Sequence, residues 1–116
     1  MQILNYYKEG RKIPDNAIYI GRASAKNGLP GSKYANPFPA KSEEDRPKVV
    51  EKYQNWLAQE IHQGRITREE LADLHGKDLV CYCAPKLCHG HVLRAAILWA
   101  VKELAQAPTR PTRLSP

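Results

Sequence analysis

The sequence predicts a small α/β domain with a short central sheet of about three strands, covered by two long helices. Three observations support this fold class. Short apolar runs typical of strands are separated by two long stretches whose apolar residues recur at helical spacing. The 116 residues are enough for one hydrophobic core. Two loops rich in polar residues each follow a predicted strand, as in α/β folds that bind ligands at the carboxyl ends of their strands.

Two strands are expected in the first part of the chain. One is Gln2–Tyr7, a run of apolar and aromatic residues. The other is Ala17–Gly21, in which Ile18 and Ile20 share one face and Tyr19 points to the other.

A long loop, Arg22–Ala40, follows the second strand. Its glycines and prolines, and its lack of any periodicity, argue against both helix and strand. A loop of this length in a small domain is usually functional or disordered. Tyr34 and Phe38 need a surface to pack on, so we expect this loop to be ordered and to carry function.

Three helices are expected in the rest of the chain. Apolar residues at i, i+3 and i+4 predict a helix over Ser42–Gln63, with Pro47 in its first turn. Thr67 and Glu70 have the spacing of a capping box and open a short helix. The third helix is expected over Cys88–Gln106.

The chemistry is expected between the last strand and the last helix. Leu79–Cys83 reads as a buried strand, Ala84–Leu87 as a loop, and Cys88 as a helix start. Such a start presents backbone N–H groups and the positive end of a dipole, which bind anions and lower the pKa of a thiol. The first turn of this helix would hold Cys88, His89, Gly90 and His91.

The cysteines and histidines of this stretch permit several interpretations. They offer enough nitrogen and sulfur ligands for zinc, but one strand–helix unit already held by helices does not need a metal, so neither a metal nor a cofactor is predicted. The cysteines of the strand can also be small core residues. No acid–base partner is evident, which leaves open whether the protein is an enzyme. The candidate catalytic residues are Cys88, His89 and His91.

Composition limits the partners. The net charge of +6 makes a nucleotide, a nucleoside or nucleic acid a plausible partner. The chain has no apolar run of membrane-spanning length and no signal-peptide pattern, so we expect a cytoplasmic protein without a membrane partner.

Residues 1–106 are expected to form one domain and residues 107–116, rich in proline and arginine, a disordered tail. The oligomeric state is left open.

A pocket for a nucleotide or nucleoside is expected where the two loops meet. Arginine, lysine, amide and backbone N–H groups suit phosphate and carbonyl oxygens, and aromatic rings can stack on a base. Several of these side chains could instead fix the loop or pack in the core. The candidate ligand-binding residues are Arg22, Lys33, Tyr34, Asn36, Phe38, Cys83, Cys88, His89 and Gly90.

Five segments together resemble a known family. They are IYIGR (18–22), GSKYANPF (31–38), EKYQNWL (51–57), GKDLVCYC (76–83) and CHGHVL (88–93). Their order resembles an uncharacterised bacterial and phage family, domain-of-unknown-function family 4326, with its run IGR … NPF … CxCxPxxCHG. The resemblance covers about residues 17–100 and departs at Tyr34 and Tyr82, where the family often has tryptophan, and at His91, where it often has an acidic residue. A looser similarity to small Rossmann-like families implies a Rossmann-like fold that handles nucleotides or nucleic acid.

Three functions are consistent with the sequence. The first is a nucleotide- or nucleoside-binding protein, with a reaction at a glycosidic or phosphate bond left open. The second is a non-catalytic phage protein that sequesters a nucleotide in the same pocket. The third is a zinc-stabilised domain that binds protein or DNA.

Overall fold

The computed structural model describes residues 1–83 and 86–106. Within them lie three short strands, one 3-10 turn and three helices. Their bounds are β1 Ile3–Asn5, β2 Ala17–Tyr19, η1 Glu43–Asp45, α1 Arg46–His62, α2 Arg68–Asp73, β3 Asp78–Cys81 and α3 His89–Gln106. The predicted tail, 107–116, lies outside the described residues.

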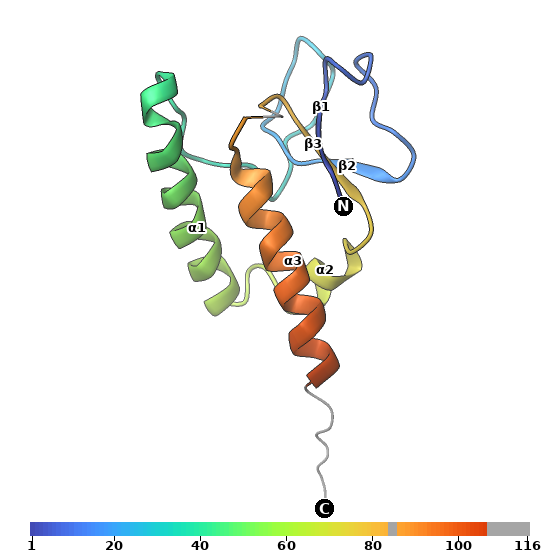
Figure 1. Ribbon diagram of the computed structural model, residues 1–116, viewed down its shortest axis with the longest axis vertical. Helices are drawn as coiled ribbons and strands as arrows, with labels where there is room; N and C mark the ends of the chain where they lie inside the picture. Colours follow the sequence, from blue (N-terminus) through green and yellow to red (C-terminus); the bar gives the residue numbers. More distant parts are fainter. Residues whose placement is uncertain (84–85, 107–116) are drawn as a thin grey trace, which may run out of the picture.

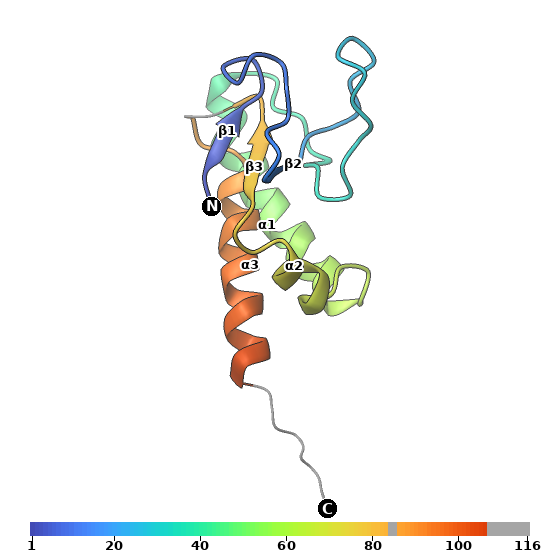
Figure 2. The same cartoon turned by 90° about the vertical axis from the view of Figure 1, so that its right-hand side faces the viewer.

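The three strands form one parallel sheet in the order β1-β3-β2. Figure 2 shows β3 between the other two strands. Ile3 is level with Leu79, and Tyr19 is level with Val80. The expectation of a small α/β protein with a three-stranded sheet is therefore confirmed.

One face of the sheet packs against the helices. Residues alternate between faces along a strand, so Leu79 and Cys81 point the same way, and both are almost completely buried. The helices supply buried residues that meet them, including Tyr53 of α1, Leu71 of α2 and Leu93 of α3. In Figure 1 α1 and α3 run beside one another, and α2 lies against α3.

The other face of the sheet is covered by tyrosines instead of helices. The rings of Tyr6, Tyr7, Tyr19 and Tyr82 contact one another, with centroids 5.3 to 5.8 Å apart. Three of these contacts are edge-on, the geometry that the ring quadrupole favours. The cluster joins the segments that follow β1 and β3 to the end of β2.

β1, β2, β3 and α1 are each shorter than the strands 2–7, 17–21 and 79–83 and the helix 42–63 that were expected, and for β1 and α1 the local reason is clear. The first strand ends at Asn5 because the Asn5 side chain accepts hydrogen bonds from the backbone N–H groups of Tyr7 and Lys8, which turns the chain. The predicted 42–63 helix begins only at Arg46, after the 3-10 turn. Pro47 has no N–H to donate, so it fits only the first turn of the helix.

The capping box of α2 forms as predicted. The Thr67 side chain accepts from the Glu70 N–H, and the Glu70 carboxylate accepts from the Thr67 N–H at 2.9 Å. Gly76 then takes a φ of +90°, which glycine adopts without strain, and leads the chain into β3.

Candidate functional site

A cavity of about 520 Å³ lies at the carboxyl edge of the parallel sheet. Residues after all three strands line it, including Tyr7 after β1, Arg22 after β2 and Cys83 after β3. The 22–40 loop, the start of α1 and the start of α3 complete the described wall. Six of the residues predicted from the sequence line this one cavity: Arg22, Asn36, Phe38, Cys83, Cys88 and His89.

Gly21 sets the path of the chain into the cavity. Tyr19 folds back over Gly21 and donates a hydrogen bond of 2.6 Å to the Arg22 carbonyl. A Cβ atom on Gly21 would overlap the Tyr19 ring. The glycine of the IGR segment is therefore required by packing, and it directs Arg22 toward the cavity wall.

Asn36 holds the loop against the helix. Its Nδ2 donates to the carbonyl of Val49 in α1, and its Oδ1 accepts from the Phe38 N–H. Its own carbonyl accepts a bond of 2.8 Å from Arg22 Nε. Asn36 thus orients both Arg22 and Phe38 while it lines the cavity.

Arg46, in the first turn of α1, is a second cation on the wall. Its guanidinium pairs with Glu43 at 2.8 Å and donates to the Leu87 carbonyl at 3.2 Å. Lys86 approaches the same carboxylate at 3.2 Å. The two cations hold the pKa of Glu43 at about 2, well below its ordinary value.

No pattern in the sequence indicates a role for Arg46. Basic residues are scattered along the whole chain, and one arginine at a helix start has no distinctive pattern. Only the packing of α1 beside the 83–88 segment reveals its role.

The three cysteines line the same cavity as this arginine. Cys81 Sγ and Cys88 Sγ lie 3.4 Å apart, and both residues are 2% exposed. Cys83 is half-buried, and its backbone N–H donates to Cys81 Sγ at 3.5 Å. No disulfide joins them.

The cysteines differ in protonation. Hydrogen bonds from Cys81 and Cys88, together with one from Arg46, lower the pKa of Cys83. Hydrogen bonds to the other two sulfurs and burial raise the pKa of Cys88. The pKa of Cys88 is therefore shifted opposite to the sequence-based expectation: the Gly90 N–H at the helix start does donate to its sulfur at 3.3 Å, but the neighbouring sulfurs and burial outweigh that bond. The favoured thiolate is Cys83.

His89 lines the cavity in a fixed orientation. Its Nε2 is 2.8 Å from the carbonyl of Ile20 and its ring is edge-on to Tyr53. A carbonyl only accepts, so Nε2 carries the proton and the neutral ring has Nδ1 as acceptor. Burial lowers the pKa of His89, so the imidazole is neutral at pH 7.

Gly90, predicted to bind ligand, is a packing residue. It is buried, and its N–H donates to Cys88 Sγ at 3.3 Å. A Cβ atom there would lie 3.1 Å from Ile20 Cδ1 and 3.2 Å from both Cys88 Sγ and Ile3 Cγ2. Gly90 lets α3 approach the sheet closely.

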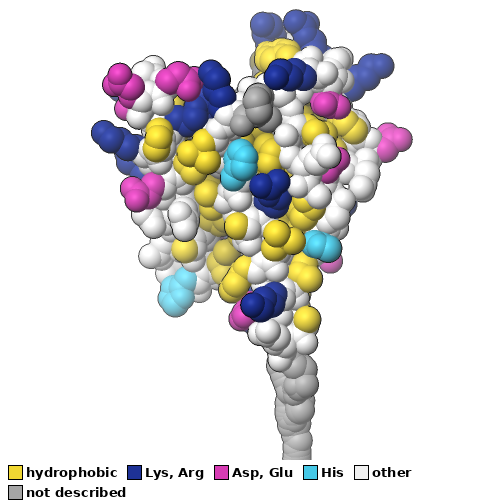
Figure 3. All heavy atoms as spheres, viewed as in Figure 1, with side chains coloured by type: hydrophobic (Ala, Val, Ile, Leu, Met, Phe, Trp, Pro, Cys, Tyr) yellow, Lys and Arg dark blue, Asp and Glu magenta, His cyan; other side chains and the backbone are white. Residues whose placement is uncertain are grey.

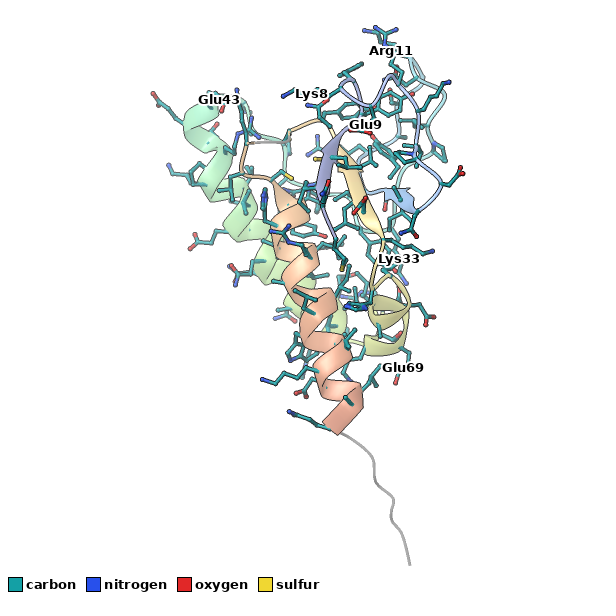
Figure 4. The ribbon with its side chains drawn as sticks, turned by 45° about the vertical axis from the view of Figure 1, so that its right-hand side comes forward. Lys8, Glu9, Arg11, Lys33, Glu43 and Glu69 are labelled. Atoms are coloured by element: carbon teal, nitrogen blue, oxygen red, sulfur yellow. The ribbon has the colours of Figure 1, made fainter. Side chains whose placement is uncertain are left out.

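Two other predicted ligand-binding residues point away from the cavity. Lys33 pairs with Glu70 of α2 at 2.8 Å, and the Tyr34 hydroxyl donates to the same carboxylate at 2.6 Å. Figure 4 shows Lys33 beside α2, far from Glu43 at the start of α1. Both side chains fasten the loop to α2.

This fastening predicts an acid-sensitive contribution to stability. Burial alone would raise the pKa of Glu70, but hydrogen bonds from Lys33, Tyr34 and the Thr67 backbone lower it to about 2. A depressed carboxylate pKa stabilises the fold above the ordinary glutamate pKa, and this stabilisation is lost as pH falls from about 4.5 to about 2. We expect Glu70→Gln to lower stability at pH 7 and to weaken the loss on acidification. Urea unfolding at pH 7 and pH 3 measures it, with the exposed neighbour Glu69→Gln as control. Identical pH profiles for the two variants would contradict this role.

His91 lies on another surface. It lines an apolar groove of about 730 Å³ between α1 and α3, with Leu57, Val92 and Trp99 among the other lining residues. Its Nδ1 is 3.2 Å from both the N and the O of Cys88. Figure 3 shows hydrophobic side chains gathered on the side of the molecule where these helices lie. His91 is thus separated from the cavity that holds Cys83.

Across residues 1–83 and 86–106, no three or more histidine, cysteine or acidic side chains are arranged to hold a metal ion. No helix among these residues has the length and apolarity to cross a membrane.

Comparisons with known proteins place the chain in a family. Neither the curated proteins nor the solved structures give a match. The family described as "Domain of unknown function (DUF4326)" matches residues 4–99, a range that includes β2, β3, all but the first residue of β1 and most of α3. The chain therefore belongs to the DUF4326 family of domains of unknown function.

Proposed function

We propose that the sheet-edge cavity binds a nucleotide or nucleoside-like anion. The observation that carries the proposal is the composition of its wall. Arg22 and Arg46 both line the cavity, and none of its described lining residues is an aspartate or a glutamate. Although Glu43 pairs with Arg46 from outside the described wall, two lining arginines and no lining carboxylate favour an anionic ligand.

Size and position support the same ligand class. A volume of about 520 Å³ is in the range of small-molecule pockets. The domain would be a small Rossmann-like fold, whose ligands lie beyond the carboxyl ends of parallel strands. Phe38 offers the face of a ring for stacking on a base, and the arginines suit a phosphate.

Binding without catalysis is the form of this function that the wall favours. A reaction at a glycosidic or phosphate bond needs a general base or acid within reach of the ligand. The described wall contains no carboxylate, and its one imidazole, that of His89, is buried and fixed by the Ile20 carbonyl, which leaves only Nδ1 as an acceptor. Chromatography of a nucleotide after prolonged incubation with the protein would distinguish the two forms, because only an enzyme yields a new product.

Arg22→Ala is expected to weaken nucleotide binding at least tenfold. A charge-assisted hydrogen bond contributes about 1.5–3 kcal/mol, and about 1.4 kcal/mol is a factor of ten in affinity. The measurement is calorimetric titration of ribonucleoside mono- and diphosphates into the wild type and the variant. The control is Arg68→Ala, which removes the same charge from exposed α2. Equal losses in both variants would indicate generic attraction to a basic protein and would refute the cavity as the site.

A further inference from the structure

The imidazole of His89 lies where the ladder between β2 and β3 ends, at the carboxyl edge of the sheet. The Ile20 N–H still donates to the Val80 carbonyl of β3 at 2.9 Å. In a continued parallel ladder the Ile20 carbonyl would accept from the backbone of the neighbouring strand. Instead, His89 Nε2 lies 2.8 Å from it. The ring therefore takes the place of a backbone donor and forms part of the cavity wall.

The second nitrogen of this ring is an acceptor that lacks a described donor. Because Nε2 carries the proton that is donated to the Ile20 carbonyl, Nδ1 of His89 can only accept. The residue is 8% exposed, and no donor within residues 1–83 and 86–106 hydrogen bonds to Nδ1. Buried acceptors are usually paired, because an unpaired one has lost its bond to water without replacement. An open acceptor on a cavity wall is a place for a donor of the ligand.

The other polar side chains of the described wall differ from His89 in this respect. Their oxygen atoms already accept hydrogen bonds from described residues; these side chains are Tyr7, Ser24, Asn36 and Tyr82. The two arginines of the wall can only donate. Among the side-chain nitrogen and oxygen acceptors of the described wall, Nδ1 of His89 is thus the one without a donor.

We propose that His89 Nδ1 accepts a hydrogen bond from an N–H or O–H group of the bound nucleotide or nucleoside and thereby selects ligands that carry such a donor. This inference rests on the proposed function of the cavity and adds its specificity. The amino group of a base and the hydroxyls of the ribose are two sources of this donor. Ionised phosphate oxygens only accept, so they suit the arginines and not Nδ1. Burial lowers the pKa of His89, so the ring accepts the bond without taking the proton.

The first test compares matched ligands by calorimetric titration into the wild type. The probes are adenosine, guanosine and cytidine monophosphates and, for each, analogues that lack the base amino group, the 2′-hydroxyl or the 3′-hydroxyl. Loss of the group that bonds Nδ1 should weaken binding about tenfold, because the buried acceptor is left unpaired. The analogue with this effect identifies the donor. Equal affinities across each set would overturn the inference and leave the proposed function in place. No binding by any probe would refute both.

The second test separates the two ring nitrogens by substitution. Glutamine places an amide N–H near the position of Nε2, so His89→Gln keeps the bond to the Ile20 carbonyl and lacks an acceptor at Nδ1. Asparagine places its amide oxygen near Nδ1, so His89→Asn keeps the acceptor and loses the Ile20 bond. His89→Gln should bind the parent nucleotide and the discriminated analogue equally. His89→Asn should keep the preference for the parent nucleotide despite a lower Tm. The reverse pattern would overturn the inference, because it would show that only the Ile20 bond matters.

Nitrogen-15 NMR of the imidazole observes Nδ1 directly in the wild-type chain. Without ligand at pH 7, His89 should show the tautomer protonated at Nε2. Saturation with the tightest-binding of these nucleotides should move the Nδ1 resonance upfield, as acceptance of a hydrogen bond does, and leave the Nε2 resonance nearly unchanged. An Nδ1 resonance that does not respond to bound nucleotide, or a tautomer protonated at Nδ1, would overturn the inference.

Discussion

Replacing Gly90 with valine is expected to destabilise the fold by roughly 3 kcal/mol, and replacing it with alanine by about 1–2 kcal/mol. The first added carbon would already lie 3.1–3.2 Å from side-chain atoms of Ile3, Ile20 and Cys88. These neighbours come from β1, from the end of β2 and from the start of α3, so relief of one contact tightens another. Urea unfolding gives the free energies.

The sign of the stability change in Gly90→Ala distinguishes a close packing position from an ordinary helix position. At an exposed helix position, glycine to alanine stabilises a protein by roughly 0.5–1 kcal/mol, because alanine has less backbone entropy to lose. At Gly90 we expect the opposite sign. The control is Ala95→Val, an exposed position of the same helix, which should cost only the propensity difference of about 0.5 kcal/mol. If Gly90→Ala proves stabilising, α3 does not pack against the sheet as described.

Removing both cavity arginines is expected to weaken nucleotide binding at least a hundredfold. Each charge-assisted contact contributes about 1.5–3 kcal/mol, so the double variant Arg22→Ala, Arg46→Ala loses two such contributions. The two side chains come from different elements, and we expect their effects to be close to additive. Titration calorimetry at fixed ionic strength measures the loss.

The matched control removes two charges elsewhere. Arg65 and Arg68 are exposed and lie beside α2, outside the described cavity wall. The double variant Arg65→Ala, Arg68→Ala has the same net charge as the cavity variant and should bind nearly as well as the wild type. A comparable loss in the two double variants would show that overall charge, and not the cavity, governs binding.

Local patterns in the sequence predicted the parts of the structure that depend on near neighbours. Thr67 and Glu70 are three residues apart, so their capping box was predictable. β2 and β3 are parallel and are connected by helices, so the residues that follow them, Arg22 and Cys83, lie at one edge of the sheet. The order of the predicted elements implied this arrangement.

The remaining features depend on contacts distant in sequence. Lys33 was assigned to the pocket because a lysine in a polar loop suits an anion, but its partner Glu70 lies 37 residues away. Arg46 reaches Leu87 across 41 residues, a contact that periodicity cannot reveal. The pKa of Cys83 is lowered and that of Cys88 is raised, the reverse of what the helix start at Cys88 predicted. These directions depend on the neighbours and the burial of each sulfur, which the local sequence does not reveal.

The central claim is that the cavity at the carboxyl edge of the sheet is the binding site. Backbone amide NMR spectra of the full chain, recorded during titration with ribonucleoside monophosphates, test it most directly. The matching nucleosides and inorganic phosphate serve as separate probes. We predict saturable shifts centred on Gly21, Ala23, Ser24 and Leu87, with little change at Val92 and Ala95 in the α1–α3 groove. Shifts centred on that groove, or shifts that do not saturate and spread over the basic surface, would contradict the claim.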